Sequence, residues 1–149
     1  MNYSLSRLKR IICLRLVEHF SLMSGWKRAT LAKLGGVNIL NEKCTYIGAG
    51  VIFDSLYPEN IEIGSHVHVK MGCIFLTHSL DTKNPNGINW KQSHIKIGNH
   101  AFIGARTIIC SDVEVGEHSI VGAGSVVTKN IPSNEIWAGN PAKFIKKRK

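Results

Sequence analysis

Residues 95–130 can be written as six consecutive groups of six: IKIGNH, AFIGAR, TIICSD, VEVGEH, SIVGAG and SVVTKN. The third residue of every group is Ile or Val, and the first is small or β-branched. An α-helix would need apolar residues to return every three or four positions, so this spacing excludes a helix. Two inward residues separated by one outward residue are typical of a β-strand, and the rest of each group has to form a corner.

The same frame runs through residues 61–78, which read IEIGSH, VHVKMG and CIFLTH. Short strands joined by corners and repeated in this way predict a parallel β-solenoid, in which about three groups close one coil. The third positions are then expected to stack along its axis. Glycine at the fourth position and His, Asn or Gly at the sixth suit corners that need unusual dihedral angles.

The frame breaks directly after His78 and resumes at Ile95. The intervening segment, residues 79–94, contains Pro85 and the pair Asn86–Gly87. A loop of this length within a compact repeat usually has a function. Histidine also occupies the sixth position at residues 66, 100 and 118, where we favour solvated corners over a metal site. We expect His100 and His118 to stack on successive coils.

Composition limits the classes of protein that fit the chain. Its 149 residues are enough for one domain, and an apolar fraction of 44% argues against wholesale disorder. The net charge of +9 favours anionic partners, but no motif of a nucleic-acid-binding module is present, so nucleic acid is not expected. The four cysteines form no CxxC pair and no secretory signal peptide is evident, which predicts reduced thiols in a cytoplasmic protein.

Residues 1–34 do not follow the six-residue pattern of the repeats. Apolar residues at 5, 8, 11, 12 and 16 fall at helical spacing, with Arg and Lys interspersed. One interpretation is a helix that covers the open end of the solenoid. The other is a basic amphipathic helix that rests on anionic lipid at the inner membrane surface. The run is too short and too charged to span a bilayer.

The repeats and the stretch AGNPAK (residues 138–143) together resemble the hexapeptide-repeat acyltransferases, and in particular the galactoside, maltose and xenobiotic acetyltransferase group. The resemblance covers roughly residues 35–147. It implies an all-β fold, a left-handed parallel β-helix over residues 35–149 with loop 79–94 and a basic C-terminal tail. Residues 1–34 then form an N-terminal helical cap. The resemblance also implies a homotrimer whose acceptor clefts lie between neighbouring solenoids.

The stretch THSLD (residues 77–81) resembles the motif in which the histidine is the catalytic base, which assigns that role to His78. Neutral imidazole can take a proton from a hydroxyl as it attacks a thioester, so no acyl-enzyme is needed. Asp81 could orient the imidazole or cap the loop. Asp54 could reach the acceptor or lie in an unrelated loop, and Trp90 could stack on a sugar or anchor the loop.

The donor implied by the resemblance is acetyl-CoA, with no metal. Backbone amides of Ala105 and Ala123 align with those that serve the thioester. Phe102 stands where the group often has tryptophan, so an indole N–H is missing there. The remaining expected contacts with coenzyme A are Thr128, Lys129, Lys143 and Lys146.

The sequence therefore predicts an acetyl-CoA-dependent O-acetyltransferase that modifies a sugar hydroxyl in polysaccharide or glycan biosynthesis. N-acetylation of an amino sugar, free or nucleotide-linked, is the alternative within enzymes. A zinc-dependent carbonic anhydrase of the same fold needs the spacing H-x4-H, but His94 and His100 are separated by five residues. A non-catalytic scaffold is the alternative outside enzymes. The sequence does not determine the acceptor.

Overall fold

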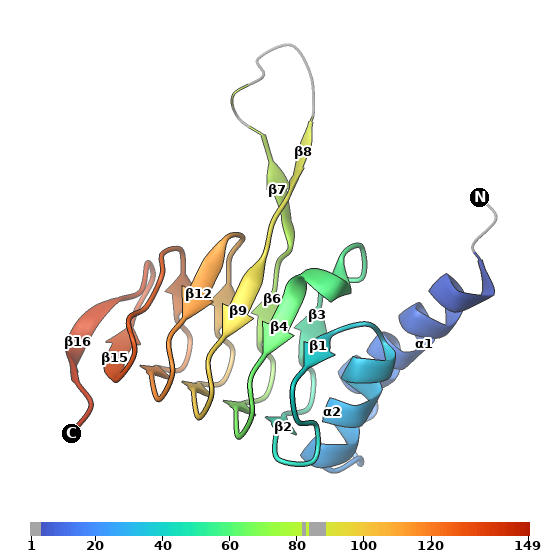
Figure 1. The fold of residues 1–149 in the computed structure, drawn as a ribbon, viewed down its shortest axis with the longest axis horizontal. Coiled ribbons are helices and arrows are strands. Elements are labelled where there is room, and N and C mark those ends of the chain that lie inside the picture. Colours follow the sequence, from blue (N-terminus) through green and yellow to red (C-terminus); the bar gives the residue numbers. More distant parts are fainter. Residues whose placement is uncertain (1–3, 82, 84–88) are drawn as a thin grey trace.

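The computed structural model of the chain describes residues 4–81, 83 and 89–149. Short parallel strands form three sheets, which we name A, B and C, and the chain visits them in turn (Figure 1). Sheet A contains β1 (Asn38–Ile39), β4 (Ile61–Ile63), β9 (Ile95–Ile97) and β12 (Val113–Val115). Sheet C contains β3 (Ile52–Phe53), β6 (Ile74–Phe75), β11 (Ile108–Ile109) and β14 (Val126–Val127). The predicted coil of short parallel strands is confirmed, whereas its handedness stays a prediction.

Sheet B extends to the C-terminal end of the solenoid. It contains β2 (Tyr46–Ile47), β5 (His68–Val69), β10 (Phe102–Ile103), β13 (Ile120–Val121), β15 (Glu135–Ala138) and β16 (Lys143–Lys147). All of these strands pair in parallel except β16, which returns antiparallel to β15. The strand pair β15–β16 therefore closes this end of the coil (Figure 1).

The core is a set of stacked columns inside the coil. The third positions of the repeats, from Ile63 to Val127, are at most 2% exposed, and so are the first positions, including the small residues Ala101 and Ser125. The pairing Phe102↔His68 and Ile103↔Val69 shows that equivalent positions lie directly above one another. Each buried Ile or Val contributes about 1.5–3 kcal/mol relative to exposure, so every coil adds to stability as it stacks on the last.

The corners confirm one half of the prediction for turn residues and correct the other. Sixth-position residues adopt the left-handed region, with φ of 57° at His100 and at His118. Their rings stack with centroids 4.7 Å apart, as expected from the spacing. The fourth-position glycines do not use positive φ. Instead, a Cβ on Gly104 would lie 2.5 Å from the backbone nitrogen of Ala123, so glycine is required by the close approach of successive coils.

Two helices lie at the N-terminal end of the solenoid (Figure 1). Helix α1 (Leu5–His19) begins after Ser4, whose hydroxyl accepts the Arg7 N–H, and packs against β3. Helix α2 (Gly25–Leu34) packs against β1 and β2. No helix among residues 4–81, 83 and 89–149 is long and apolar enough to cross a membrane.

The face of α1 that packs differs from the predicted one. The residues Cys13, Leu14 and Val17 are buried, whereas Leu8 and Ile12 are about half exposed and Leu5 is 88% exposed. The helix thus has two apolar faces, and the stripe recognised from the spacing mostly points to solvent.

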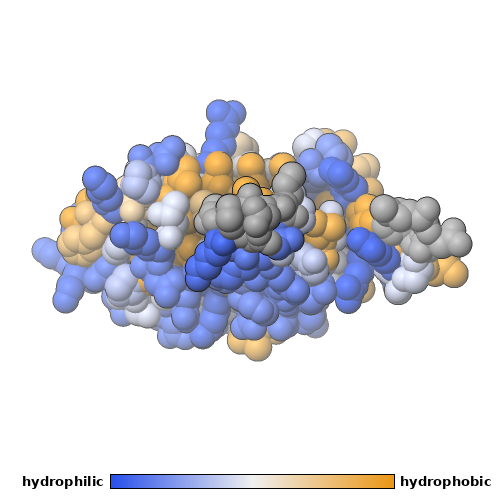
Figure 2. Space-filling view, turned by 90° about the horizontal axis from the view of Figure 1, so that it is seen from above, coloured by the Kyte–Doolittle hydropathy of each residue, from blue (hydrophilic) through white to orange (hydrophobic). Residues whose placement is uncertain are grey.

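The outer faces of sheets A and C differ in character. Outward residues of sheet A are polar or charged, including Glu62, Lys96 and Glu114, whereas those of sheet C are aliphatic. The aliphatic positions in register are Ile52, Ile74, Ile108 and Val126. Figure 2 looks down on the edge between the two sheets, with an orange hydrophobic band on one side and a mostly blue hydrophilic surface on the other. The sheet C face is therefore an exposed apolar surface of the single chain.

Candidate active site

The chain leaves the coil at the edge where sheet C leads into sheet A. After β6 it enters a hairpin of β7 (His78–Leu80) and β8 (Trp90–Gln92), which projects from the solenoid (Figure 1). The Ser93 N–H donates to the Thr77 carbonyl over 2.8 Å and closes the base of the hairpin. His78 therefore begins a strand here, in place of the left-handed corner that its frame position predicts. The predicted turn residues Pro85, Asn86 and Gly87 lie outside the described residues.

Asp54 binds the imidazole of His78. It follows β3, one coil below β6, and its Oδ2 contacts His78 Nδ1 in a short hydrogen bond. The same oxygen accepts the Thr77 N–H over 3.0 Å, and Oδ1 accepts the Leu56 N–H over 3.0 Å. The aspartate is only 8% exposed, so these donors replace the water that the carboxylate loses.

Electrostatics at this pair favour a charged aspartate. Burial alone would raise the pKa of Asp54, but the N–H of Leu56, the His78 imidazole and the N–H of Thr77 outweigh it and hold the pKa below its ordinary value. An ionised Asp54 accepts the proton on Nδ1 of His78. In a neutral imidazole that donates from Nδ1, the other ring nitrogen, Nε2, is unprotonated and can accept a proton.

A cavity of about 230 Å³ reaches His78 from the side of α1. Its apolar walls come from the helix and from sheet C, and include Leu14, Phe53 and Leu76. Arg15 and Glu18 also line it and form an ion pair at 2.8 Å. Sequence reasoning did not connect α1 with the histidine, because the repeat frame says nothing about which coil the helix covers.

The other two candidates on the hairpin are placed differently. The Trp90 ring meets the His78 ring edge-on, with centroids 5.4 Å apart, and is 65% exposed. Asp81 accepts the Lys83 N–H over 3.0 Å and donates its own N–H to Asn89, which is the geometry of a loop cap. The carboxylate beside His78 is therefore that of Asp54.

The expected coenzyme A contacts are divided between the two edges of sheet C. Ala105 and Ala123 lie at the corner between sheets B and C, with Phe102 on the outer face of sheet B and Lys143 and Lys146 on β16. Thr128 and Lys129 follow β14 and lie on the edge shared by Asp54 and His78. We name these the BC edge and the CA edge.

The two edges are separated by the width of sheet C. The Arg106 N–H bonds to the Met71 carbonyl, so Ala105 is level with Met71, six residues before Thr77. After the turn at Met71 and Gly72, the chain runs from Cys73 through β6 to Thr77, and five residues of extended chain span roughly 15 Å. A single chain therefore does not bring His78 together with Ala105 and Ala123.

The cysteines have no part in this arrangement. All four thiols are free, and Cys73 is fully buried with its Sγ directed at the Gly104 carbonyl at 3.1 Å. Burial raises the pKa of both Cys73 and Cys110, which makes these thiols poor nucleophiles. Within the described part of the chain, no group of three or more His, Cys, Asp or Glu side chains is placed to hold a metal ion.

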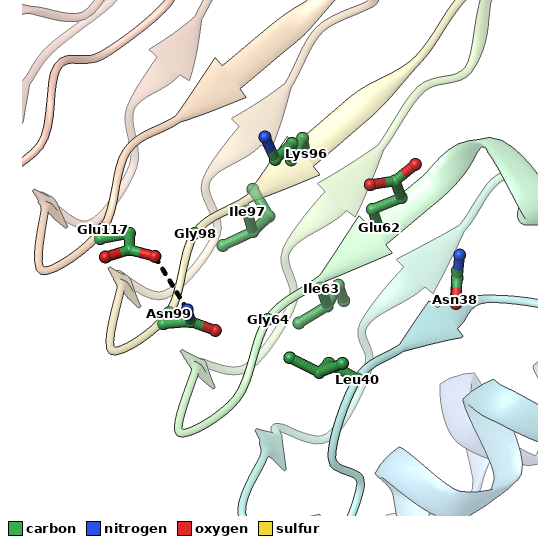
Figure 3. A pocket seen from close by; sticks show the side chains of 10 residues that line it. All are labelled: Asn38, Leu40, Glu62, Ile63, Gly64, Lys96, Ile97, Gly98, Asn99 and Glu117. Atoms are coloured by element: carbon green, nitrogen blue, oxygen red, sulfur yellow. Dashed lines mark hydrogen bonds between the residues drawn. The ribbon is translucent and has the colours of Figure 1, made fainter.

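A separate groove of about 260 Å³ lies on the outer face of sheet A (Figure 3). Its charged side chains are Glu62, Lys96 and Glu117, so both signs of charge line it. The Asn99 amide donates to Glu117 over 2.8 Å, and Lys96 pairs with Glu114 at 2.9 Å. None of the predicted site residues lines this groove.

A coil built from six-residue groups, interrupted where His78 contacts Asp54, defines a hexapeptide-repeat protein. Residues 94–129 match the family described as bacterial transferase hexapeptide (six repeats). The chain is 44% identical to Protein CapG of Staphylococcus aureus over 116 residues, which cover 74% of this chain and 66% of CapG. The chain belongs to the hexapeptide-repeat acyltransferase family. It spans about two thirds or less of the length of the curated relatives that it matches.

Solved structures agree with this assignment. A maltose O-acetyltransferase from Clostridium difficile superposes with a TM-score of 0.62 at 25% identity, covering 99% of this chain and 90% of that one. The polySia specific acetyltransferase NeuO superposes with a TM-score of 0.57 at 32% identity, covering 69% of this chain and 49% of NeuO.

Proposed function

We propose that the protein is an acetyl-CoA-dependent O-acetyltransferase that modifies a sugar hydroxyl in polysaccharide or glycan biosynthesis. The observation that carries the proposal is the imidazole of His78, held through Nδ1 by the buried carboxylate of Asp54 beside a cavity. Two relatives support the class of acceptor by their names, a maltose O-acetyltransferase and a polySia specific acetyltransferase.

His78 acts as the general base in this mechanism. Its Nε2 takes the proton of the acceptor hydroxyl while that oxygen bonds to the thioester carbonyl carbon, and the C–S bond then breaks. The imidazolium returns its proton to the departing thiolate, so the histidine ends as it began. Asp54 is a positioning residue that fixes the tautomer and stabilises the imidazolium. Such a base contributes about 10²–10⁴-fold in rate.

A homotrimer completes the proposed site. A closed ring with sheet C facing its axis buries the aliphatic residues Ile52, Ile74, Ile108 and Val126. The same ring places the BC edge of one copy beside the CA edge of the next. His78 of one copy would then act on a thioester bound by Ala105, Ala123 and Phe102 of its neighbour, with Lys143 and Lys146 binding the phosphates. Thr128 and Lys129 lie further along the CA edge, which also carries His78. The proposal includes a left-handed coil in each copy.

The proposal includes a cytoplasmic location with peripheral contact to anionic lipid. The free thiols support the first part. The exposed stripe of Leu5, Leu8 and Ile12 on α1, next to Arg and Lys, supports the second, in addition to the packing of the helix on the first coil. Co-sedimentation with vesicles of anionic and of neutral lipid tests it, because only the anionic vesicles are expected to bind the protein.

Thiol release from acetyl-CoA tests the proposed reaction directly. The acceptors are sugars, oligosaccharides and amino sugars, and the proteins are the wild type, His78→Ala and, as a control, His94→Ala, whose imidazole is exposed outside the site. We expect release with a hydroxyl acceptor, a loss of at least about 10²-fold in His78→Ala, and no loss in the control. Equal activity of His78→Ala would reject the base, release only with amino sugars would favour N-acetylation, and failure to bind acetyl-CoA would favour a scaffold.

A further inference from the structure

A concavity of about 720 Å³ lies on the BC edge, at the foot of the stacked corners. The corner residues Ala49, Met71, Ala105 and Ala123 follow one another up this edge, since each is linked to the next coil by a backbone hydrogen bond of 2.8–2.9 Å. The concavity is bounded by the first three of them, by Tyr46 and by the start of α2. The concavity therefore lies next to Ala105, at the N-terminal end of the row of corners whose amides we propose to bind the thioester.

Lys70 presents an unpaired positive charge at this concavity. Its Nζ lies 5.2 Å from the ring centroid of Tyr46 and 5.4 Å from that of Phe102, which is the geometry of cation–π contacts. Among the residues that the structure describes, no carboxylate lies within ion-pair distance of it. The rings hold the ammonium group in place without neutralising it.

Arg28, also in the wall of the concavity, is a second uncompensated cation. It is only 3% exposed, and its guanidinium donates to the carbonyls of Ile47 over 3.3 Å and of Ser21 over 2.8 Å. Its Nε has no hydrogen-bond partner, and no described Asp or Glu pairs with the group. Burial of a guanidinium without a counter-charge is costly, so an anion in the concavity would stabilise it.

The N-terminus of α2 adds a positive partial charge to that of Lys70 and Arg28 at the concavity. The first turn of the helix borders the concavity, and Ser24 makes no side-chain capping bond, so N–H groups at the positive end of the helix dipole remain available. None of the residues that line the concavity is Asp or Glu. The groove on sheet A differs on this point, because Glu62 and Glu117 line it together with Lys96 (Figure 3).

An aromatic ring lies at the rim. Trp26 is 44% exposed and meets Tyr46 edge-on, with centroids 5.5 Å apart. An indole in this position can pack against the apolar face of a sugar ring while the cations bind a group attached to that ring.

We propose that this concavity binds an acidic sugar, through a carboxylate or phosphate group that contacts Lys70 and a ring that packs on Trp26. The inference rests on the proposed function, because it names the acceptor as an anionic sugar. In the proposed trimer this edge adjoins the edge of the next copy that carries His78, so a sugar bound here lies in the cleft where the base acts.

Binding is measured without acetyl-CoA, so that it does not depend on turnover. The tryptophan fluorescence of the full chain is titrated with glucuronate, glucose 6-phosphate and glucose at constant ionic strength. We expect at least one of the two acids to bind about tenfold or more tightly than glucose. The acid that binds more tightly identifies the group as carboxylate or phosphate.

Three variants locate the binding. Lys70→Met keeps the apolar stem and is expected to remove the preference for the acid, and Trp26→Phe is expected to weaken all three sugars. The matched control is Lys96→Met on sheet A, which removes an exposed lysine and should leave the preference intact. Circular dichroism spectra confirm that each variant is folded.

The outcomes separate this inference from the proposed function. A preference for acid that survives in Lys70→Met, or its absence in the wild type, overturns the inference, even if neutral sugars are acetylated. Weaker binding of coenzyme A to Lys70→Met would assign the concavity to the donor and also overturn it. Binding of the acid through Lys70 without thiol release for any acceptor would leave the anion site standing and reject the transferase.

Discussion

The substitution Asp54→Asn isolates the part that this carboxylate plays at His78. In the wild type, Oδ2 accepts both His78 Nδ1–H and the Thr77 N–H, and Oδ1 accepts the Leu56 N–H. An asparagine has one acceptor oxygen for these donors, and its NH₂ group can only donate. If the oxygen keeps the Leu56 N–H, the NH₂ group takes the place of Oδ2, faces Nδ1 and moves the imidazole proton to Nε2, where it blocks the base.

The expected losses follow from these contacts. Loss of general-base catalysis lowers kcat by roughly 10²–10⁴-fold, with a smaller change in KM because the cavity walls are unchanged. Loss of one hydrogen bond to a charged group costs about 1.5–3 kcal/mol in the free energy of unfolding. The variant therefore remains folded but becomes nearly inactive.

The pH dependence of stability provides a second readout. Because the pKa of Asp54 is lowered by folding, its contribution is present at pH values above its ordinary value of 3.8 and is lost as the pH falls through the folded-state pKa. The wild type is thus expected to lose stability over this acidic range, and Asp54→Asn to lose less. Urea denaturation at several pH values measures the difference.

Asp112→Asn is the matched control for this substitution. Asp112 lies on the same edge, pairs with the exposed Lys91, and has a left-handed φ of 56° that asparagine also tolerates. We expect its kcat to equal that of the wild type. An Asp54→Asn enzyme with wild-type kcat would refute the argument, as would the same loss in Asp112→Asn.

Two further predictions concern the coil and its assembly. Gly104→Ala places a Cβ 2.5 Å from the Ala123 nitrogen, so its free energy of unfolding, measured by urea denaturation, should fall by several kcal/mol. Gly124→Ala has open space but a φ of 69°, so it should lose about 1–2 kcal/mol. Equal losses would contradict the close approach of the coils as the reason for glycine at position 104. Ile108→Glu puts a charge on the outer face of sheet C, so we expect monomers in sedimentation and no thiol release from acetyl-CoA. The control Glu62→Gln, on the outer face of sheet A, should leave the trimer intact. A wild-type monomer with full activity would reject this assembly.

The repeat allowed the sequence to predict the inward positions of the coil. Period six is imposed by the backbone, so residues such as Ile103 and Val121 could be placed in the core without knowing any contact. The left-handed corners at His66, His100 and His118 follow from the same frame. The reason for the fourth-position glycines was wrong, because a single repeat does not show how closely the next coil approaches.

Contacts that join different parts of the frame were harder to predict. Asp54 and His78 are 24 residues apart on either side of a frame slip, so their pairing depends on how the irregular turn around η1 (Pro58–Asn60) restores the register. Lys70 and Arg28 line one concavity only because α2 packs on the first coils. The orientation of α1 could not be read from spacing, since both of its faces carry apolar residues.

The hairpin leaves the solenoid and returns without disturbing it. Because Ser93 bonds to Thr77 at its base, β9 pairs in register with β4 as if no residues had been inserted, with Ile61 opposite Ile95. The hairpin of β7 and β8 is therefore an insertion that leaves the register of the coil unchanged. Substitutions in β7 and β8 beyond the base of the hairpin are expected to leave the register of the coil unchanged, so the sequence of the hairpin can vary independently of the core.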